Sequence, residues 1–176
     1  MTLAATPDTV LVAGASGFIG RALGRALAAR HRVVGLSRQD RVGADGYDRF
    51  LRCDLLSLED TERALEGVRV AVYLVHSMMP SARLTQASFA DIDLLCADNF
   101  ARAAARAGVE RIVYLGGLIP GGGEDGRALS EHLRSRPEVE RALASTGVPV
   151  TVLRAGLVLG AAGSSFQIVA RLVRRL

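Results

Sequence analysis

The stretch TVLVAGASGFIGRALGRALAARHRVVGLSR, residues 9–38, decides the fold of this chain. Its first apolar run, Val10–Ala13, is typical of a strand buried on both faces of a parallel sheet. Glycines spaced G-x-x-G-x-x-G follow, and apolar residues at helical spacing then run from Phe18 to Leu27. A second apolar run, Val33–Leu36, completes the pattern. This order predicts a strand–turn–helix–strand unit with a parallel strand pair.

The glycine turn suits the phosphates of a dinucleotide. Glycine lets the backbone turn sharply and approach a pyrophosphate, and the positive end of the following helix attracts its charge. A glycine triplet alone is weak support, but its place between a strand and a helix in a unit of about 30 residues makes it specific. A tight turn that binds nothing is the alternative. The residues that we expect to contact the cofactor here are Gly14, Ser16, Gly17, Phe18, Ile19 and Gly20.

The residues after the second strand favour NADP(H) over NAD(H). An NAD-binding unit usually carries an acid there, which binds the ribose 2′-hydroxyl. This chain has Ser37 and Arg38 instead, and a hydroxyl with a guanidinium suits a 2′-phosphate. The nearby Asp40 keeps NAD(H) open, and a solvated surface arginine is the alternative interpretation of Arg38.

Strand and helix patterns alternate along the rest of the chain. Apolar runs predict strands at 49–53, 70–75, 111–115 and 150–154, and helical spacing predicts helices at 57–65, 88–107 and 127–146. Pro137 inside the last of these predicts a kink or two shorter helices. The fold class is therefore α/β, a doubly wound parallel sheet of the Rossmann type in three α/β/α layers. We also expect a loop at 119–126 that could cover the site and a basic amphipathic helix at 167–176.

Ligands of such sheets bind at the carboxyl ends of the strands. Asp54 and Leu55 follow the third strand, where an acid could reach an adenine ring or serve as a turn or cap residue. Val75 and His76 end the fourth strand, so His76 is either a contact to the nicotinamide or substrate or a structural histidine. Gly116 ends the fifth strand and completes the set of expected cofactor contacts.

Asn99 interrupts the apolar stripe of the helix predicted at 88–107. A polar side chain on a buried stripe must be hydrogen-bonded or functional. The helices that flank this segment could also pair two subunits in a homodimer.

The amino-acid composition excludes several classes of function. The chain has 176 residues, enough for one domain, and 22 basic against 18 acidic residues. Every basic residue is arginine, which excludes Schiff-base and P-loop lysine chemistry, and the even spread of arginines does not favour nucleic-acid binding. Cys53 and Cys96 lack metal-ligand spacing and fit a reducing, cytoplasmic interior, so we expect no metal. We expect no signal peptide, because MTLAATPDT at the start has no basic stretch followed by an apolar one. We expect no membrane span, because no apolar run reaches about 18 residues.

Several motifs together resemble the short-chain dehydrogenase/reductase superfamily in its atypical branch. They are GASGFIG, CDL, YLVHSM, NFARAAARAGVERIVYLGG and GVPVTVLRAGLVLG. Within that branch, YLVHSM with LSEHLRSR and SSFQIVARLVRRL is similar to bacterial NAD(P)H-binding epimerase-like proteins. NmrA-like redox sensors and the epimerase/dehydratases are similar more distantly. The resemblance implies a Rossmann domain that binds NAD(P)(H), and it implies much less about the reaction.

The chain departs from that superfamily at the catalytic residues. Gly117 stands about where the family has a serine, while His132 and Arg136 stand at the positions of its Tyr-x-x-x-Lys pair. A histidine could act as general acid or base, and an arginine could hold ribose hydroxyls or a substrate carboxylate but could not move a proton. Ser130, Tyr114 or backbone amides could replace the missing serine donor. The alternative is that His132 and Arg136 are ordinary surface residues.

Two functions stay open after the sequence alone. The first is an oxidoreductase or epimerase-like enzyme that moves a hydride between nicotinamide and a small carbonyl or hydroxyl substrate. The second is a non-catalytic NADP(H)-binding redox sensor or assembly subunit. We expect residues 1–176 to form a single cofactor-binding domain with little or no C-terminal substrate domain, because about 20 residues follow Arg154. A small substrate, a partner chain or a longer protein would each account for this.

Overall fold

The structure is a computed structural model that describes residues 8–76, 89–118, 131–156, 158–160, 171 and 173. For residues 89–90 and 131–135 it describes the backbone alone. The elements follow one another as β1 (Thr9–Ala13), α1 (Phe18–Leu27), β2 (Arg32–Ser37), β3 (Arg49–Arg52), α2 (Leu58–Leu65), β4 (Val70–Tyr73), α3 (Phe89–Arg106), β5 (Arg111–Gly117), α4 (Glu131–Ala144) and β6 (Val150–Ala155).

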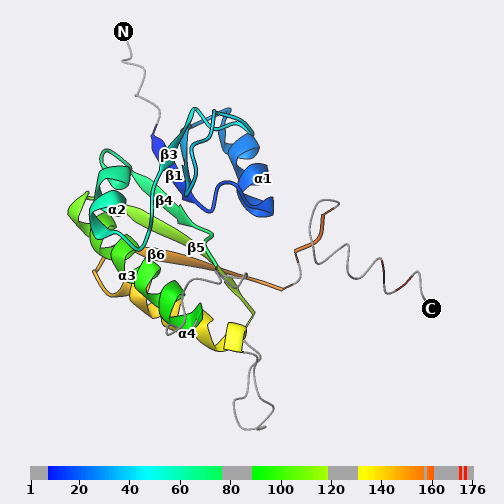
Figure 1. The fold of residues 1–176 in the computed structure, drawn as a ribbon, viewed down its shortest axis with the longest axis vertical. Helices are drawn as coiled ribbons and strands as arrows, with labels where there is room; N and C mark the ends of the chain where they lie inside the picture. Colours follow the sequence, from blue (N-terminus) through cyan, green and yellow to red (C-terminus); the bar gives the residue numbers. More distant parts are fainter. Residues whose placement is uncertain are drawn as a thin grey trace.

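The six strands form one parallel sheet in the order β3-β2-β1-β4-β5-β6 (Figure 1). The chain moves outward from β1 to β3 and then returns to place β4 on the other side of β1. Val12 in β1 is accordingly in register with Gly35 of β2 and with Val72 of β4. This reversal between β1 and β4 is the switch point of a doubly wound fold, so the predicted Rossmann fold class is confirmed.

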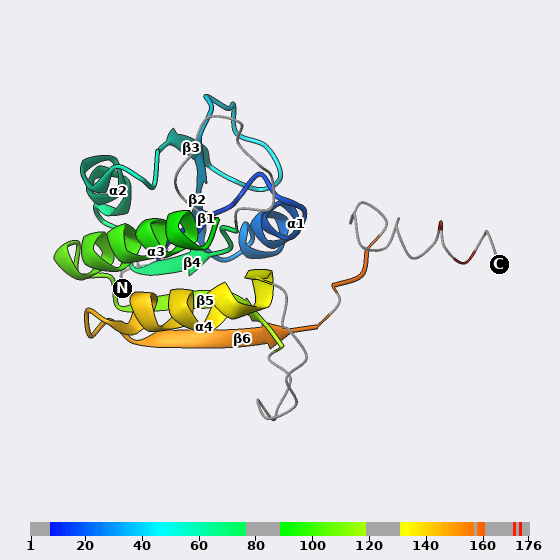
Figure 2. The same cartoon turned by 60° about the horizontal axis from the view of Figure 1, so that its bottom comes forward.

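Helices cover both faces of the sheet (Figure 2). Because side chains alternate along a strand, Leu11 and Ala13 face the core shared with α2, α3 and α4, while Val10 and Val12 face the core shared with α1. Helices α3 and α4 pack against each other along the first of these faces. The three predicted α/β/α layers are therefore present.

The helix ends follow their local sequence signals. The hydroxyl of Ser57 accepts a hydrogen bond from the Asp60 amide at 3.2 Å and caps α2. Gly108, two residues after the end of α3, has φ +70°, a left-handed conformation that glycine adopts without strain. Both ends lie where the sequence predicts them.

Helix α4 corrects one expectation. It continues through Pro137 as a single helix, so the alternative of two shorter helices is wrong. Val139 and Leu143 of α4 are buried in the core shared with α3, and this packing outweighs the hydrogen bond that proline cannot donate. Residues 127–130 of the predicted helix, the loop at 119–126 and all but residues 171 and 173 of the predicted final helix lie outside the described residues.

In the parts of the chain that the structure describes, no helix has the length and hydropathy needed to cross a membrane.

The close packing of α1 on β1 leads to a prediction about stability. A Cβ at Gly20 would collide with the Gly14 carbonyl oxygen and lie 2.7 Å from Cα of Ala15. We expect Gly20→Ala to lower the free energy of unfolding by about 1–3 kcal/mol, the range typical of overpacking. Urea unfolding followed by circular dichroism would measure it. Gly17→Ala is the matched control, because its Cβ would lie 3.3 Å from the same oxygen. Equal stability of the two variants would contradict the steric account.

Candidate functional site at the carboxyl edge of the sheet

The glycine turn joins β1 to α1 and leaves the start of the helix open. Gly14 has φ +87° and lies against the backbone of Leu74, where a Cβ would approach to 3.1 Å. The Gly17 amide donates to the Gly14 carbonyl at 3.0 Å, and Gly17 is itself the exposed N-cap of α1. No side chain caps this helix, and its first turn has no acidic residue. The amides of the first helical turn, Phe18, Ile19 and Gly20, and the positive dipole end therefore remain available to an anion.

Tyr47 holds the other side of this turn in place. Its buried hydroxyl donates to the Gly20 carbonyl at 2.6 Å, and its ring occupies the space that a Cβ at Gly24 would need. Burial raises the pKa of Tyr47 to about 12, which keeps the hydroxyl protonated and able to donate. The sequence patterns did not single out Tyr47. An aromatic residue among polar neighbours was the available signal.

The predicted cofactor contacts lie after successive parallel strands, at one edge of the sheet. Ser37 ends β2 and the exposed Arg38 follows it. Asp54 follows β3 and its Oδ1 accepts from the Leu56 amide at 3.0 Å, so the turn role that the sequence allowed is present. The Asp54 side chain is exposed as well, and a contact to adenine stays a prediction.

Asn99 on α3 is hydrogen-bonded to the loop after β3, as its place on an apolar stripe predicts. The side-chain amide of Asn99 donates to the carbonyls of Leu55 and Leu56 at 2.9 and 3.1 Å. The residue is 5% exposed, so these two bonds satisfy a buried donor group and fix the segment after β3.

A polar cluster lies at the ends of β4 and β5. Nη1 of Arg136 on α4 lies 2.6 Å from Nε2 of His76, which follows β4 after Val75. The same Nε2 lies 3.2 Å from the carbonyl oxygen of Leu115 on β5. The ring of His76 meets that of Tyr114 edge-on at a centroid distance of 6.1 Å. Gly116 follows at the same strand end, close to the Tyr114 ring.

The structure describes the side chain of only one member of the predicted pair on α4, His132 and Arg136. His132 and Arg136 lie in one unbroken helix, which their i, i+4 spacing requires. Arg136 is half-buried and contacts His76, a partner that the sequence analysis did not foresee. The side chain of His132 and all of Ser130 lie outside the described residues, so their roles stay predictions.

The two cysteines are buried, Cys53 directly after β3 and Cys96 on α3. Burial is the main cause that raises the pKa of Cys53 to about 11 and that of Cys96 to about 12. The negative charges of Asp60 and Asp54 add to the effect at Cys53. Both thiols are therefore protonated near neutral pH and are poor nucleophiles.

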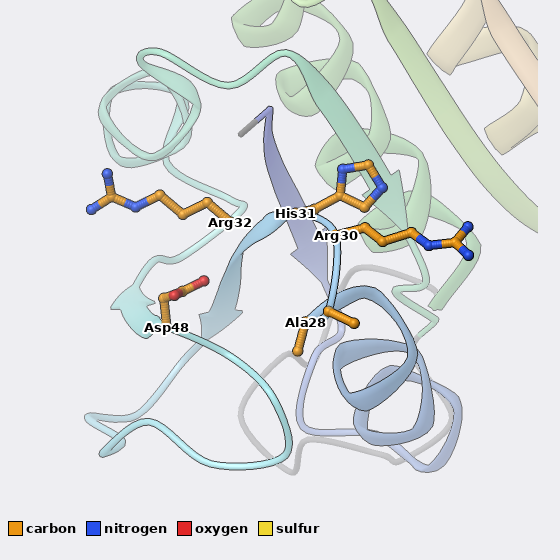
Figure 3. A pocket seen from close by; sticks show the side chains of 6 residues that line it. Ala28, Arg30, His31, Arg32 and Asp48 are labelled. Carbon is orange, nitrogen blue, oxygen red and sulfur yellow. The ribbon is translucent and has the colours of Figure 1, made fainter. Parts of the chain in front are cut away.

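A cavity of about 350 Å³ lies at the opposite, amino-terminal edge of the sheet (Figure 3). Its lining includes Arg30, His31, Arg32 and Asp48. The two arginines point in opposite directions, and Asp48 accepts a hydrogen bond from the Val33 amide at 2.6 Å. The basic groups do not converge on one point, so this cavity does not form a built anion site. Within the described ranges, no group of three or more metal-ligating side chains comes together either.

The thiol pKa values give a labelling prediction. At pH 8 a thiol of pKa about 11 is ionised in about one molecule in a thousand. We expect the folded protein to react with a thiol reagent such as DTNB far more slowly than free cysteine, and both thiols to react promptly in guanidinium chloride. Absorbance at 412 nm follows the reaction. Prompt labelling of either cysteine in the folded protein at pH 8 would contradict the burial.

Comparisons with known proteins agree with this geometry. The model of the NAD dependent epimerase/dehydratase family matches residues 10–176. The auxiliary protein GraX of Staphylococcus aureus is 32% identical over 110 residues, which are 61% of this chain and 36% of GraX. The match thus spans about a third of that relative's length.

Solved structures show the same fold. MoeE5 in complex with UDP-glucose and NAD is 29% identical with a TM-score of 0.73, over 95% of this chain and 60% of that one. WbmG of Bordetella bronchiseptica, in complex with NAD, is 19% identical with a TM-score of 0.75, over 99% of this chain and 62% of that one. The family model covers the glycine turn and every strand from β2 to β6. The chain therefore belongs to the NAD dependent epimerase/dehydratase family.

Proposed function

We propose that this chain binds a nicotinamide dinucleotide at the glycine turn and is an oxidoreductase or an epimerase-like enzyme on a carbonyl or hydroxyl substrate. The observation that carries the proposal is the uncapped start of α1 above the exposed Gly17. A pyrophosphate would accept hydrogen bonds there from the amides of the first turn. Family membership supports the same cofactor.

The strand ends would hold the rest of the dinucleotide. Ser37 and Arg38 would lie beside the adenosine ribose, and Asp54 with Leu55 would lie beside the adenine. The residues Val75, His76 and Gly116 would line the nicotinamide half. When bound, the nicotinamide supplies or accepts a hydride at the substrate carbon. The chain itself would contribute binding and orientation at these ends.

The preference for NADP(H) rests on charges after β2. Arg38 is exposed and would reach a 2′-phosphate with a permanent positive charge. Asp40 lies 3.8 Å from Arg52, which partly neutralises the one acid that could favour a bare diol. The related structures named above contain NAD, so the NADP preference is a proposal about this chain alone.

The reaction needs a proton donor and acceptor. His132 is our candidate, since the positions of the superfamily's serine, tyrosine and lysine carry Gly117, His132 and Arg136. Sugar nucleotides are the first substrates to screen, because MoeE5 was solved with UDP-glucose. Cofactor binding without turnover of any such substrate would favour the redox-sensor or assembly role instead.

A bulky residue at the turn should block the cofactor. Gly17→Val would place a branched side chain where the pyrophosphate must approach, so we expect dinucleotide affinity to fall by at least about tenfold. Isothermal calorimetry with NADPH would measure the loss, and circular dichroism would verify the fold. The control is Ala29→Val, which places a valine at an exposed position after the far end of α1. Unchanged NADPH affinity of a folded Gly17→Val variant would remove the turn from the site.

Arg38 should set cofactor choice. We expect Arg38→Glu to weaken NADPH binding at least about tenfold more than NADH binding, because it replaces an attractive charge with a repulsive one beside the 2′-phosphate. Arg41→Glu changes the net charge equally and serves as the control. Equal losses for NADPH and NADH would mean that Arg38 does not contact the 2′-phosphate.

A further inference from the structure

The side chain of Arg136 extends from α4 to the end of β4, where it contacts the imidazole of His76 and not a carboxylate. Its Nη1 lies 2.6 Å from His76 Nε2, and the guanidinium is half-buried. Seven other arginines form ion pairs with acids within 4.0 Å, namely Arg25, Arg52, Arg63, Arg69, Arg102, Arg106 and Arg154. Among the side chains that the structure describes, no carboxylate lies within that distance of Arg136.

The contact fixes the form of the histidine. Nε2 can accept a hydrogen bond from the guanidinium only while it carries no proton, whereas it would need a proton to donate to the Leu115 carbonyl 3.2 Å away. Arginine is always charged, so a second positive charge on the ring at 2.6 Å is disfavoured. The neutral imidazole with Nε2 as acceptor therefore fits the shorter contact. His76 Nδ1 is buried, so a substrate does not reach the ring through that atom.

The acidic groups near Arg136 do not pair with its guanidinium. Burial raises the pKa of Tyr114, and the adjacent Arg136 guanidinium opposes that rise. The acids whose charges reach this tyrosine are Asp93, 4% exposed on α3, and Glu140 on α4. Both carboxylate oxygens of Glu140 already accept from Arg154, at 2.8 and 2.9 Å. A bound anion would be attracted by the charge of Arg136, and the charge of Asp93 would oppose part of that attraction.

We propose that Arg136 is an anion-binding residue of the substrate site, and that His76 is the positioning residue that holds it. The group bound is a carboxylate or a phosphate of the substrate, because planar guanidinium donors match paired anionic oxygens. The imidazole engages Nη1, and the Tyr114 hydroxyl is a second hydrogen-bonding neighbour of the guanidinium. The N–H donors that these two groups leave would bind the ligand. The inference rests on the proposed function only in that it places the substrate beside the nicotinamide end, at the ends of β4 and β5.

The test uses the full chain with and without saturating NAD⁺, titrated by calorimetry with inorganic phosphate and, separately, with malonate. We expect one or both anions to bind, and Arg136→Gln to weaken that binding at least about tenfold. Arg136→Lys should retain part of it. Arg141→Gln is the matched control on the same helix, because it removes an equal charge from an exposed arginine. Phosphate binding alone would assign a phosphate substrate group, and malonate binding alone a carboxylate.

The histidine is tested by a pair of variants. His76→Gln keeps an acceptor for the guanidinium and should keep anion affinity within about threefold, whereas His76→Leu removes the acceptor and should lower the affinity further than that. Thermal midpoints of all variants are measured alongside, so that loss of fold is not taken for loss of binding. Equal effects of the glutamine and leucine variants would overturn the positioning role of His76.

Two results would overturn the anion site. One is absence of binding of either anion, and the other is equal affinity of the wild type and a folded Arg136→Gln. The affinity for NAD⁺ is measured separately in the same preparations. NAD⁺ binding without an Arg136-dependent anion would reject this inference and leave the proposed function intact. Anion binding without any NAD⁺ affinity would reject the proposed function.

Discussion

Helix α1 begins directly above the end of β1, and this close approach is the constraint on which the site depends. It is possible only because the facing residues lack side chains. A Cβ at Gly20 would collide with the Gly14 carbonyl, and Gly14 itself turns the chain at φ +87°. Tyr47 then secures the arrangement by donating to the Gly20 carbonyl. The same geometry that packs the helix exposes its first amides at the edge of the sheet.

The parallel sheet brings the other candidate site residues to the same edge as the glycine turn. Because all six strands run in one direction, the segments that follow them meet at a single edge. The order β3-β2-β1-β4-β5-β6 places the glycine turn at the centre, with the ends of β2 and β3 on one side and those of β4 and β5 on the other. Asn99 and Arg136 reach this edge from α3 and α4 and brace the segments after β3 and β4.

Sequence patterns predicted the fold, and with it the strand ends on which the candidate site residues lie. Apolar runs such as Val10–Ala13 mark strands buried on both faces, and cap residues such as Ser57 mark helix starts, so local signals agree with the final structure. The failures have a physical cause. Local patterns did not point to Tyr47 because its burial depends on α1, and α4 continues through Pro137 because Val139 and Leu143 pack on α3. Arg136 contacts His76, 60 positions away, and no spacing rule reveals such a partner.

The central claim is that the first turn of α1 binds the pyrophosphate of a dinucleotide. Amide proton–nitrogen NMR spectra recorded during a titration with NADPH test it most directly. The account predicts saturable shifts of the Gly17, Phe18 and Ile19 amides, larger than those of Ala28 and Arg30 at the far end of the α1 segment. Saturable shifts confined to other parts of the chain, or no shifts at all, would contradict the account.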